Sequence, residues 1–117
     1  MISAIHIALS GLSAFMKQLN VSAHNLANVN TDGFKRSETS FTETLSGGVL
    51  PIIRKDNSSG PTVLRNSSQG FVPIEISNVD IGTELVNQMI AQRGFEANLR
   101  TMKTADDMLG SILDTRK

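Results

Sequence analysis

The sequence lacks cysteine, tryptophan and tyrosine, and it contains only two histidines, His6 and His24. The absence of cysteine excludes disulfides, thiol nucleophiles and cysteine-ligated zinc or iron–sulfur centres. Two histidines exclude a histidine-rich metal site, and a Ser-His-Asp triad would have to use one of them. We therefore expect no metal, no other cofactor and no catalytic residues.

Large rings and excess charge are also scarce. Aromatic residues make up 4% of the 117 residues, and hydrophobic residues 39%. A chain of this length forms one domain, and with so few rings its core is small and its stability alone is marginal. Eleven basic residues balance 11 acidic ones. This balance argues against nucleic-acid binding, which requires a basic face.

No long, clean apolar run is present. The most apolar stretch, residues 1–16, is interrupted by serine, histidine and glycine. A membrane span needs about 20 predominantly apolar residues, so we expect no membrane insertion. No lysine or arginine precedes this stretch, which argues against a secretory signal peptide.

The N-terminal third carries a heptad pattern that predicts a helix over residues 4–27, capped by Ser3 and ending near Asn28 or Asn30. Apolar residues recur there at alternating intervals of four and three, at Ile5, Leu9, Leu12, Met16, Leu19, Ala23 and Leu26. Gly11 lies inside this helix. It is either tolerated locally or marks the close approach of a second helix.

The C-terminal third predicts a second long helix over residues 80–114, beginning at Asp80. Its apolar stripe comprises Leu85, Met89, Phe95, Leu99, Met102, Leu109 and Ile112. A helix of this length needs a partner along its axis. We expect the two helices to pair as an antiparallel, coiled-coil-like hairpin.

Residues 35–78 hold all three prolines and a polar run at residues 56–60. Three β-prone stretches, 48–54, 62–65 and 70–76, are flanked by turn residues, and Pro51 and Pro73 demote two of them to edge strands. The fold class is therefore mainly α with a short β and loop insert. Three segments, 1–34, 35–78 and 79–117, together form one domain.

The most informative stretch is Ser22–Arg36, SAHNLANVNTDGFKR. Its residue types predict the end of a helix. The short asparagine amides can bond the backbone N–H and C=O groups that are free there, and a tight turn follows. The residues that carry this turn are Asn25, Asn28, Asn30, Thr31, Gly33 and Phe34. Nothing in this reading alone requires a function beyond stopping the helix.

This stretch closely resembles the N-terminal signature of the bacterial flagellar rod and hook proteins, the axial proteins of the flagellar basal body. The segment Ser77–Leu109 is similar to the C-terminal helix of the same family, through SNVD at 77–80, ELVN at 84–87 and the A-x-R-x-x-E-x-N pattern at 91–98. Two departures are Phe95, where the family usually has tyrosine or another aromatic, and Gly94, where alanine is common. The short insert resembles that of a proximal-rod-type member.

The resemblance implies a structural subunit of the basal-body rod, without enzymatic activity, that assembles helically through its terminal helices. Its implied partners are itself, neighbouring axial proteins and the flagellar type III export apparatus. It implies a location in the periplasm-spanning rod, reached from the cytoplasm without a cleaved signal. The assembly seam would comprise Ile5, Leu9, Leu12, Met16, Leu19, Leu26, Leu85, Met89, Phe95, Leu99, Met102 and Leu109. The alternative is a soluble cytoplasmic adaptor or regulatory coiled-coil module related to rod proteins.

Family members also use a short Phe-x-x-x-hydrophobe element for export. Phe41 and Leu45 match this pattern. Phe15–Leu19 and Phe95–Leu99 match it as well, but helical core spacing explains both.

Overall fold

The computed structural model describes residues 2–115. Two long helices, α1 (Ile2–Ala27) and α2 (Ile81–Asp114), flank two β-hairpins. The first hairpin consists of β1 (Ser37–Glu43) and β2 (Val49–Lys55), and the second of β3 (Thr62–Ser67) and β4 (Gly70–Glu75). The molecule measures 83 × 24 × 18 Å. It is therefore a rod-shaped chain with a small β insert, as the sequence predicts.

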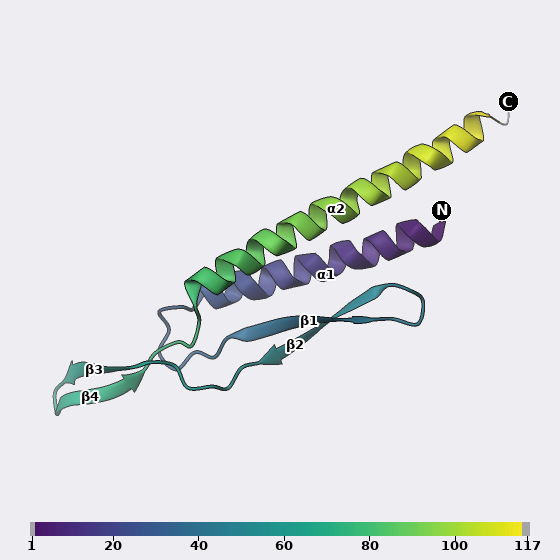
Figure 1. Cartoon of the computed structure of the whole chain (residues 1–117). Coiled ribbons are helices and arrows are strands. Elements are labelled where there is room, and N and C mark those ends of the chain that lie inside the picture. The colour runs from purple at the N-terminus through teal and green to yellow at the C-terminus, as the bar shows by residue number, and fades with distance from the viewer. Residues whose placement is uncertain (1, 116–117) are drawn as a thin grey trace.

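The two helices lie side by side, with the N-terminal end of α1 beside the C-terminal end of α2 (Figure 1). Ser22, late in α1, bonds to Glu84, early in α2, while Gly11 faces Asn98 further along α2. The hairpin β1–β2 runs along α1, whereas β3–β4 projects beyond the end of the helix pair (Figure 1). The helix pair, the hairpin β1–β2 and the hairpin β3–β4 therefore meet near the end of α1.

The interior between the helices is narrow and is formed by small side chains. The buried hydrophobic residues are Ala8, Leu12, Ala14, Ala91 and Ala105. Small residues allow two helix backbones to approach closely, but they bury little apolar area. Most large hydrophobic side chains of both helices remain exposed as a result.

Gly11 and Gly94 mark the two closest approaches. A Cβ on Gly11 would lie 2.5 Å from Oδ1 of Asn98, and a Cβ on Gly94 would lie 2.4 Å from the Phe15 ring. Asn98 also donates from Nδ2 to the carbonyl of Gly94 at 2.8 Å. The second reading of Gly11, close approach of a helix, is confirmed. The two glycines fix the register of α1 against α2.

We predict opposite effects for two glycine-to-alanine changes in α2. Gly94→Ala displaces the Phe15 ring from its contact with Phe41. It therefore destabilises the protein by about 1–3 kcal/mol, although alanine has the higher helix propensity. Gly110→Ala meets open space and stabilises by about 0.5–1 kcal/mol. Urea unfolding followed by circular dichroism measures both changes. Equal stabilisation by the two variants would contradict the close approach at Gly94.

Helix boundaries agree with the sequence at three of four ends. α1 ends at Ala27, and α2 begins after Asp80, whose carboxylate accepts from the Thr83 backbone N–H. The predicted cap at Ser3 is wrong, because α1 already includes Ile2 and Ser3 lies within its first turn.

The β-prone stretches at 48–54, 62–65 and 70–76 became β2, β3 and β4, all in two-stranded sheets in which every strand is an edge. Pro51 pairs with Phe41, and Pro73 pairs with Leu64. The sequence did not predict β1, whose polar residues Ser37–Glu43 lack an apolar run. This strand forms because β2 and α1 supply its partners.

By length and composition, α1 is apolar enough to cross a membrane, with a mean hydropathy of 1.2 over its most apolar window. This departs from the expectation of no such segment. A single helix of this kind near the N-terminus is weak evidence, because core helices and signal sequences have the same length and composition.

Candidate assembly site

A buried polar cluster joins α1, α2 and β1 where the helices meet. It comprises Ser22, Asn25, Ser37 and Glu84. Asn25 is 1% exposed and donates from Nδ2 to Oε1 of Glu84 at 2.9 Å and to the Ser37 carbonyl at 2.7 Å. Its Oδ1 accepts from the Ser37 backbone N–H at 2.9 Å, so one amide binds a helix and a strand together.

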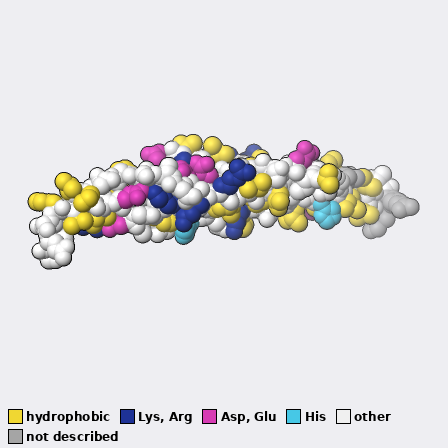
Figure 2. Space-filling view, turned by 90° about the horizontal axis from the view of Figure 1, so that it is seen from below, with side chains coloured by type: hydrophobic (Ala, Val, Ile, Leu, Met, Phe, Trp, Pro, Cys, Tyr) yellow, Lys and Arg dark blue, Asp and Glu magenta, His cyan; other side chains and the backbone are white. Residues whose placement is uncertain are grey.

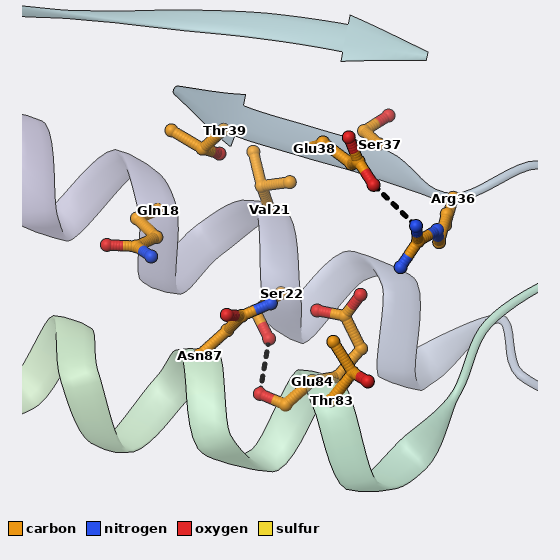
Figure 3. A pocket seen from close by; sticks show the side chains of 10 residues that line it. All are labelled: Gln18, Val21, Ser22, Arg36, Ser37, Glu38, Thr39, Thr83, Glu84 and Asn87. Carbon is orange, nitrogen blue, oxygen red and sulfur yellow. Dashed lines mark hydrogen bonds and ion pairs between the residues drawn. The ribbon is translucent and has the colours of Figure 1, made fainter. Parts of the chain in front are cut away.

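Glu84 completes this cluster from the first turn of α2, where a carboxylate interacts favourably with the helix dipole. Its carbonyl accepts from Oγ of Ser22 at 2.8 Å (Figure 3). Glu84 is 3% exposed. Buried charges are tolerated only when hydrogen-bonded, so Asn25 and Glu84 depend on each other.

In the turn after α1, Asn28 makes the predicted bond to a free helix carbonyl, whereas the Asn25 amide bonds Ser37 and Glu84 instead. Asn28 donates from Nδ2 to the His24 carbonyl at 2.9 Å, and Oγ1 of Thr31 donates to Oδ1 of Asn28 at 3.1 Å. Gly33 has a positive φ of 67°, and its N–H donates to the Glu75 carbonyl. Phe34 packs edge-to-face on His24 with ring centroids 5.4 Å apart. Asn30 lies in the same turn and is exposed.

A second set of bonds, here called the polar joint, holds the base of both hairpins. It comprises Lys35, Arg36, Asp56, Ser58, Gly60, Glu75 and Asn78. Asn78 accepts from the Arg36 backbone N–H at 2.7 Å and donates to the carbonyls of Asp56 and Ser58. The Asn78 side chain therefore connects segments 33–36, 56–60 and 75–78.

The carboxylates of the polar joint are held ionised. The backbone N–H and the side-chain hydroxyl of Ser58, followed by the Arg36 guanidinium, lower the pKa of Asp56 to about 2. The Lys35 ammonium and the Gly60 N–H lower the pKa of Glu75. The Asp56 carboxylate in turn raises the pKa of Arg36. Ion pairs and hydrogen bonds therefore favour the charged states of Arg36, Asp56 and Glu75.

We predict that acid loosens the polar joint. Both carboxyl groups have a lower pKa in the folded chain than in the unfolded one, so their stabilisation is complete above the unfolded pKa of about 4. It is lost as the pH falls from there towards 2. Thermal unfolding between pH 7 and pH 2.5 should show a melting temperature that is flat above pH 5 and then falls. Asp56→Asn should weaken that fall, and an unchanged acid slope would contradict the assignment.

A polar cavity of about 330 Å³ opens beside the buried polar cluster. Figure 3 shows its lining from α1, β1 and the start of α2. Gln18 and Thr39 line it, and each carries one buried side-chain oxygen without a protein partner. Within residues 2–115, no group of three His, Asp or Glu side chains is placed to hold a metal ion.

The predicted seam residues of α1 divide into two sets. Leu9 and Met16 are 52% and 51% exposed, and Leu19 is also exposed. Leu12 is buried, whereas Ile5 and Leu26 are half-buried. The helix pair uses an adjacent face of α1 that includes Gly11, Phe15 and Ser22.

The seam residues of α2 divide in the same way. Leu85, Met89 and Leu99 are exposed, and Phe95, Met102 and Leu109 are half-buried. We call the six outward residues, Leu9, Met16, Leu19, Leu85, Met89 and Leu99, the exposed seam. These six side chains are 39–66% exposed within the described chain.

The candidate export residues lie on β1 and on the turn that follows it. Phe41 is half-exposed and packs edge-to-face on Phe15 with centroids 5.4 Å apart. Leu45, in the β1–β2 turn, is fully exposed. The structure thus places Phe41 against α1 and Leu45 in solvent.

The fold and these sites define an elongated protein of paired terminal helices, with a hydrogen-bonded polar junction and many exposed large hydrophobic side chains. Two family models match the chain. The flagella basal body rod protein model matches residues 5–35, and the C-terminal model of the flagellar basal body rod FlgEFG proteins matches residues 68–115.

Individual relatives agree with these matches. The flagellar basal-body rod protein FlgG of Buchnera aphidicola subsp. Baizongia pistaciae is 53% identical over 89 residues, covering 74% of this chain and 32% of the relative. FlgG of Bacillus subtilis is 29% identical over 89 residues, covering 75% and 32%. The flagellar hook protein FlgE of Escherichia coli is 44% identical over 43 residues, covering 37% and 11%.

The chain belongs to the flagellar rod and hook protein family. It spans about a third or less of the length of these relatives. The two matched regions contain Glu75 and Asn78 of the polar joint, to which sequence reasoning assigned no structural role. Ser77 and Asn78 stand in the quoted SNVD motif, and Arg36 follows the N-terminal motif directly. Asp56 and Ser58 lie between the two matched regions, where only their place in a polar turn marked them.

Proposed function

We propose that this chain is a structural subunit of the flagellar basal-body rod and that it assembles helically through its terminal helices. The observation that carries the proposal is the contrast between core and surface. The buried hydrophobic residues are four alanines and one leucine, while the exposed seam runs along both helices. Apolar surface of this extent marks an interaction site.

The building unit of this proposal is the antiparallel, coiled-coil-like pair of α1 and α2, with segments 1–34, 35–78 and 79–117 acting as one domain. The buried polar cluster and the two glycine contacts support it, because they fix the register of the pair. A unit of fixed register presents the same exposed seam in every copy. Identical contacts between copies are what a helical array requires.

The partners in this proposal are other copies of the chain and neighbouring axial proteins. The subunit leaves the cytoplasm through the type III export apparatus, without a cleaved signal, and lies in the rod that spans the periplasm. Phe41 and Leu45 act as the export element. In support, a chain with a small core and no disulfide unfolds at little cost before export.

The experiment is a secretion and motility assay in cells that depend on this chain for their rod. Leu9→Asp and Leu99→Asp should allow secretion but abolish motility, because each would bury an unpaired charge between copies. Thr104→Asp, at an exposed polar position of α2, is the matched control and should leave motility intact. Normal motility in both seam variants would contradict the proposal.

Two further readouts of the same assay test the other parts of the proposal. Phe41→Ala combined with Leu45→Ala should lower secretion without lowering the cytoplasmic level of the chain. Unchanged secretion would exclude this export element. A chain retained in the cytoplasm of cells that export other axial proteins would instead favour the adaptor alternative.

A further inference from the structure

The hairpin β3–β4 exposes apolar side chains on both of its faces. Leu64 is 69% exposed and Phe71 is 73% exposed, and Val63 and Val72 are also exposed. In the register of the hairpin, Leu64 pairs with Pro73 and Asn66 with Phe71, which places Leu64 and Phe71 on the same face. A two-stranded sheet without a covering layer is marginally stable in water. This hairpin therefore needs a partner.

Its own chain does not supply that partner. Among residues 2–115, neither helix contacts β3 or β4, and the hairpin projects past the end of the helix pair (Figure 1). Figure 2 shows hydrophobic side chains gathered at that end of the molecule. The tip is also uncharged, because residues 66–74 contain no Asp, Glu, Lys or Arg. Such a surface can be buried without desolvating a charge.

Two contacts, one from the middle of the hairpin and one from its base, connect it to the rest of the chain. The guanidinium of Arg65 donates to both carboxylate oxygens of Asp32, at 2.6 and 3.1 Å. Glu75, at the end of β4, is bonded into the polar joint. Because two independent anchors hold it, the hairpin presents Leu64 and Phe71 in one orientation in each copy.

A matching surface lies on the helix pair. A groove of about 560 Å³ there is lined almost entirely by apolar side chains, and its one charged residue, Arg93, is largely exposed. Its volume is sufficient for the two side chains of the hairpin tip, and an exposed guanidinium can stack on the face of an inserted phenyl ring. The lining residues are Phe15, Val86, Met89, Ile90, Arg93 and Gly94.

We propose that the tip of β3–β4 inserts Leu64 and Phe71 into this groove on a second copy of the chain. The inference rests on the proposed function, because it names one contact of the assembly. The hairpin and the groove are different surfaces of one molecule, so the contact is head-to-tail and leaves a free hairpin and a free groove at the two ends. A contact of this type extends into a helical array. Two hairpins that pack on each other would instead close a dimer.

Disulfide crosslinking tests this contact, because the chain contains no native cysteine. Phe71→Cys and Ile90→Cys proteins are mixed in equal amounts, concentrated and oxidised, and the dimers are identified by mass spectrometry. We expect a heterodisulfide between the two variants, since insertion brings the side chains within disulfide range. Leu45→Cys mixed with Ile90→Cys is the control, because Leu45 is more exposed than Phe71 and collides at least as often.

Two crosslinking outcomes would overturn the inference. One is a heterodisulfide yield for Phe71→Cys with Ile90→Cys no higher than that of the Leu45→Cys control. The other is a predominance of Phe71→Cys homodimers, which would indicate that the hairpins pack on each other.

A second measurement separates this inference from the proposed function. Phe71→Ser leaves the helices intact by circular dichroism but should raise the critical concentration for assembly, measured by light scattering, at least about tenfold. If wild type and Phe71→Ser assemble at the same concentration, the hairpin contact is wrong while the proposed function stands. If wild type fails to assemble at any concentration, the proposed function fails and the hairpin contact falls with it.

Discussion

Asn25→Asp should destabilise the protein by about 3–5 kcal/mol at pH 7. In the native chain, Nδ2 of Asn25 donates to Glu84 at 2.9 Å and to the Ser37 carbonyl at 2.7 Å. The substitution replaces this donor with a carboxylate that faces another carboxylate and a carbonyl. Two carboxylates at this distance in a buried site cannot both ionise, so part of the lost stability should return as the pH falls towards 5. Urea unfolding at pH 7 and pH 5 measures both effects.

Asn25→Ala provides the matched control. It also removes the three hydrogen bonds of Asn25, but it adds no charge, so its destabilisation should be nearly the same at the two pH values. If Asn25→Asp is as stable as wild type at pH 7, or if its loss is independent of pH, the account of the buried polar cluster is wrong.

Gly60→Ala should cost about 2–4 kcal/mol, a size typical of backbone incompatibility. A Cβ at this position would lie 2.1 Å from the carbonyl oxygen of Ile76 and 3.0 Å from the carbonyl carbon of Ser77. Both atoms belong to the backbone, so no side chain can move aside. The displaced loop would also lose the bond from the Gly60 N–H to Glu75 at 2.7 Å. Thermal unfolding measures the loss.

Ser59→Ala is the neighbouring control for this position. Ser59 is exposed and lies in the same loop, so its substitution should change stability by less than about 0.5 kcal/mol. Nuclear magnetic resonance of Gly60→Ala should show shifts concentrated at residues 33–36 and 75–78, because these segments meet in the polar joint. Equal stability of Gly60→Ala and Ser59→Ala would contradict the close packing of the joint.

The helices could be predicted from the sequence because their signals are local. The heptad spacing from Ile5 to Leu26 and the cap at Asp80 depend on residues that are neighbours along the chain. The start of α1 could not be predicted in this way. Ser3 is a good capping residue, but the helix continues past it to Ile2.

The pairing of the helices was harder to predict than the helices themselves. The heptad spacing selects Leu9, Met16 and Leu19, yet the interior is formed by Ala8, Gly11 and Ala14, where smaller side chains bring the backbones closer. Hydrophobic periodicity identifies apolar residues, but it does not identify which apolar face meets the partner within the same chain.

Contacts between distant segments gave no signal in the sequence. The polar joint depends on Asn78 reaching Arg36, which is 42 positions away. The turn at Thr31–Gly33 was predictable because Gly33 adopts a positive φ in a recognisable turn. The bond from Asn25 to Glu84, 59 positions away, was not predictable from the sequence.

The central claim is that the exposed seam becomes ordered against other copies of the chain. Limited proteolysis with mass spectrometry of the fragments, at low and at high protein concentration, tests it most directly. The account predicts rapid cleavage within α1 and α2 when the protein is dilute and protection of both helices when it is concentrated. Leu9→Asp should lose the protection at high concentration. Helices that resist cleavage equally at every concentration would contradict the claim, because the exposed seam would then gain no protection from other copies.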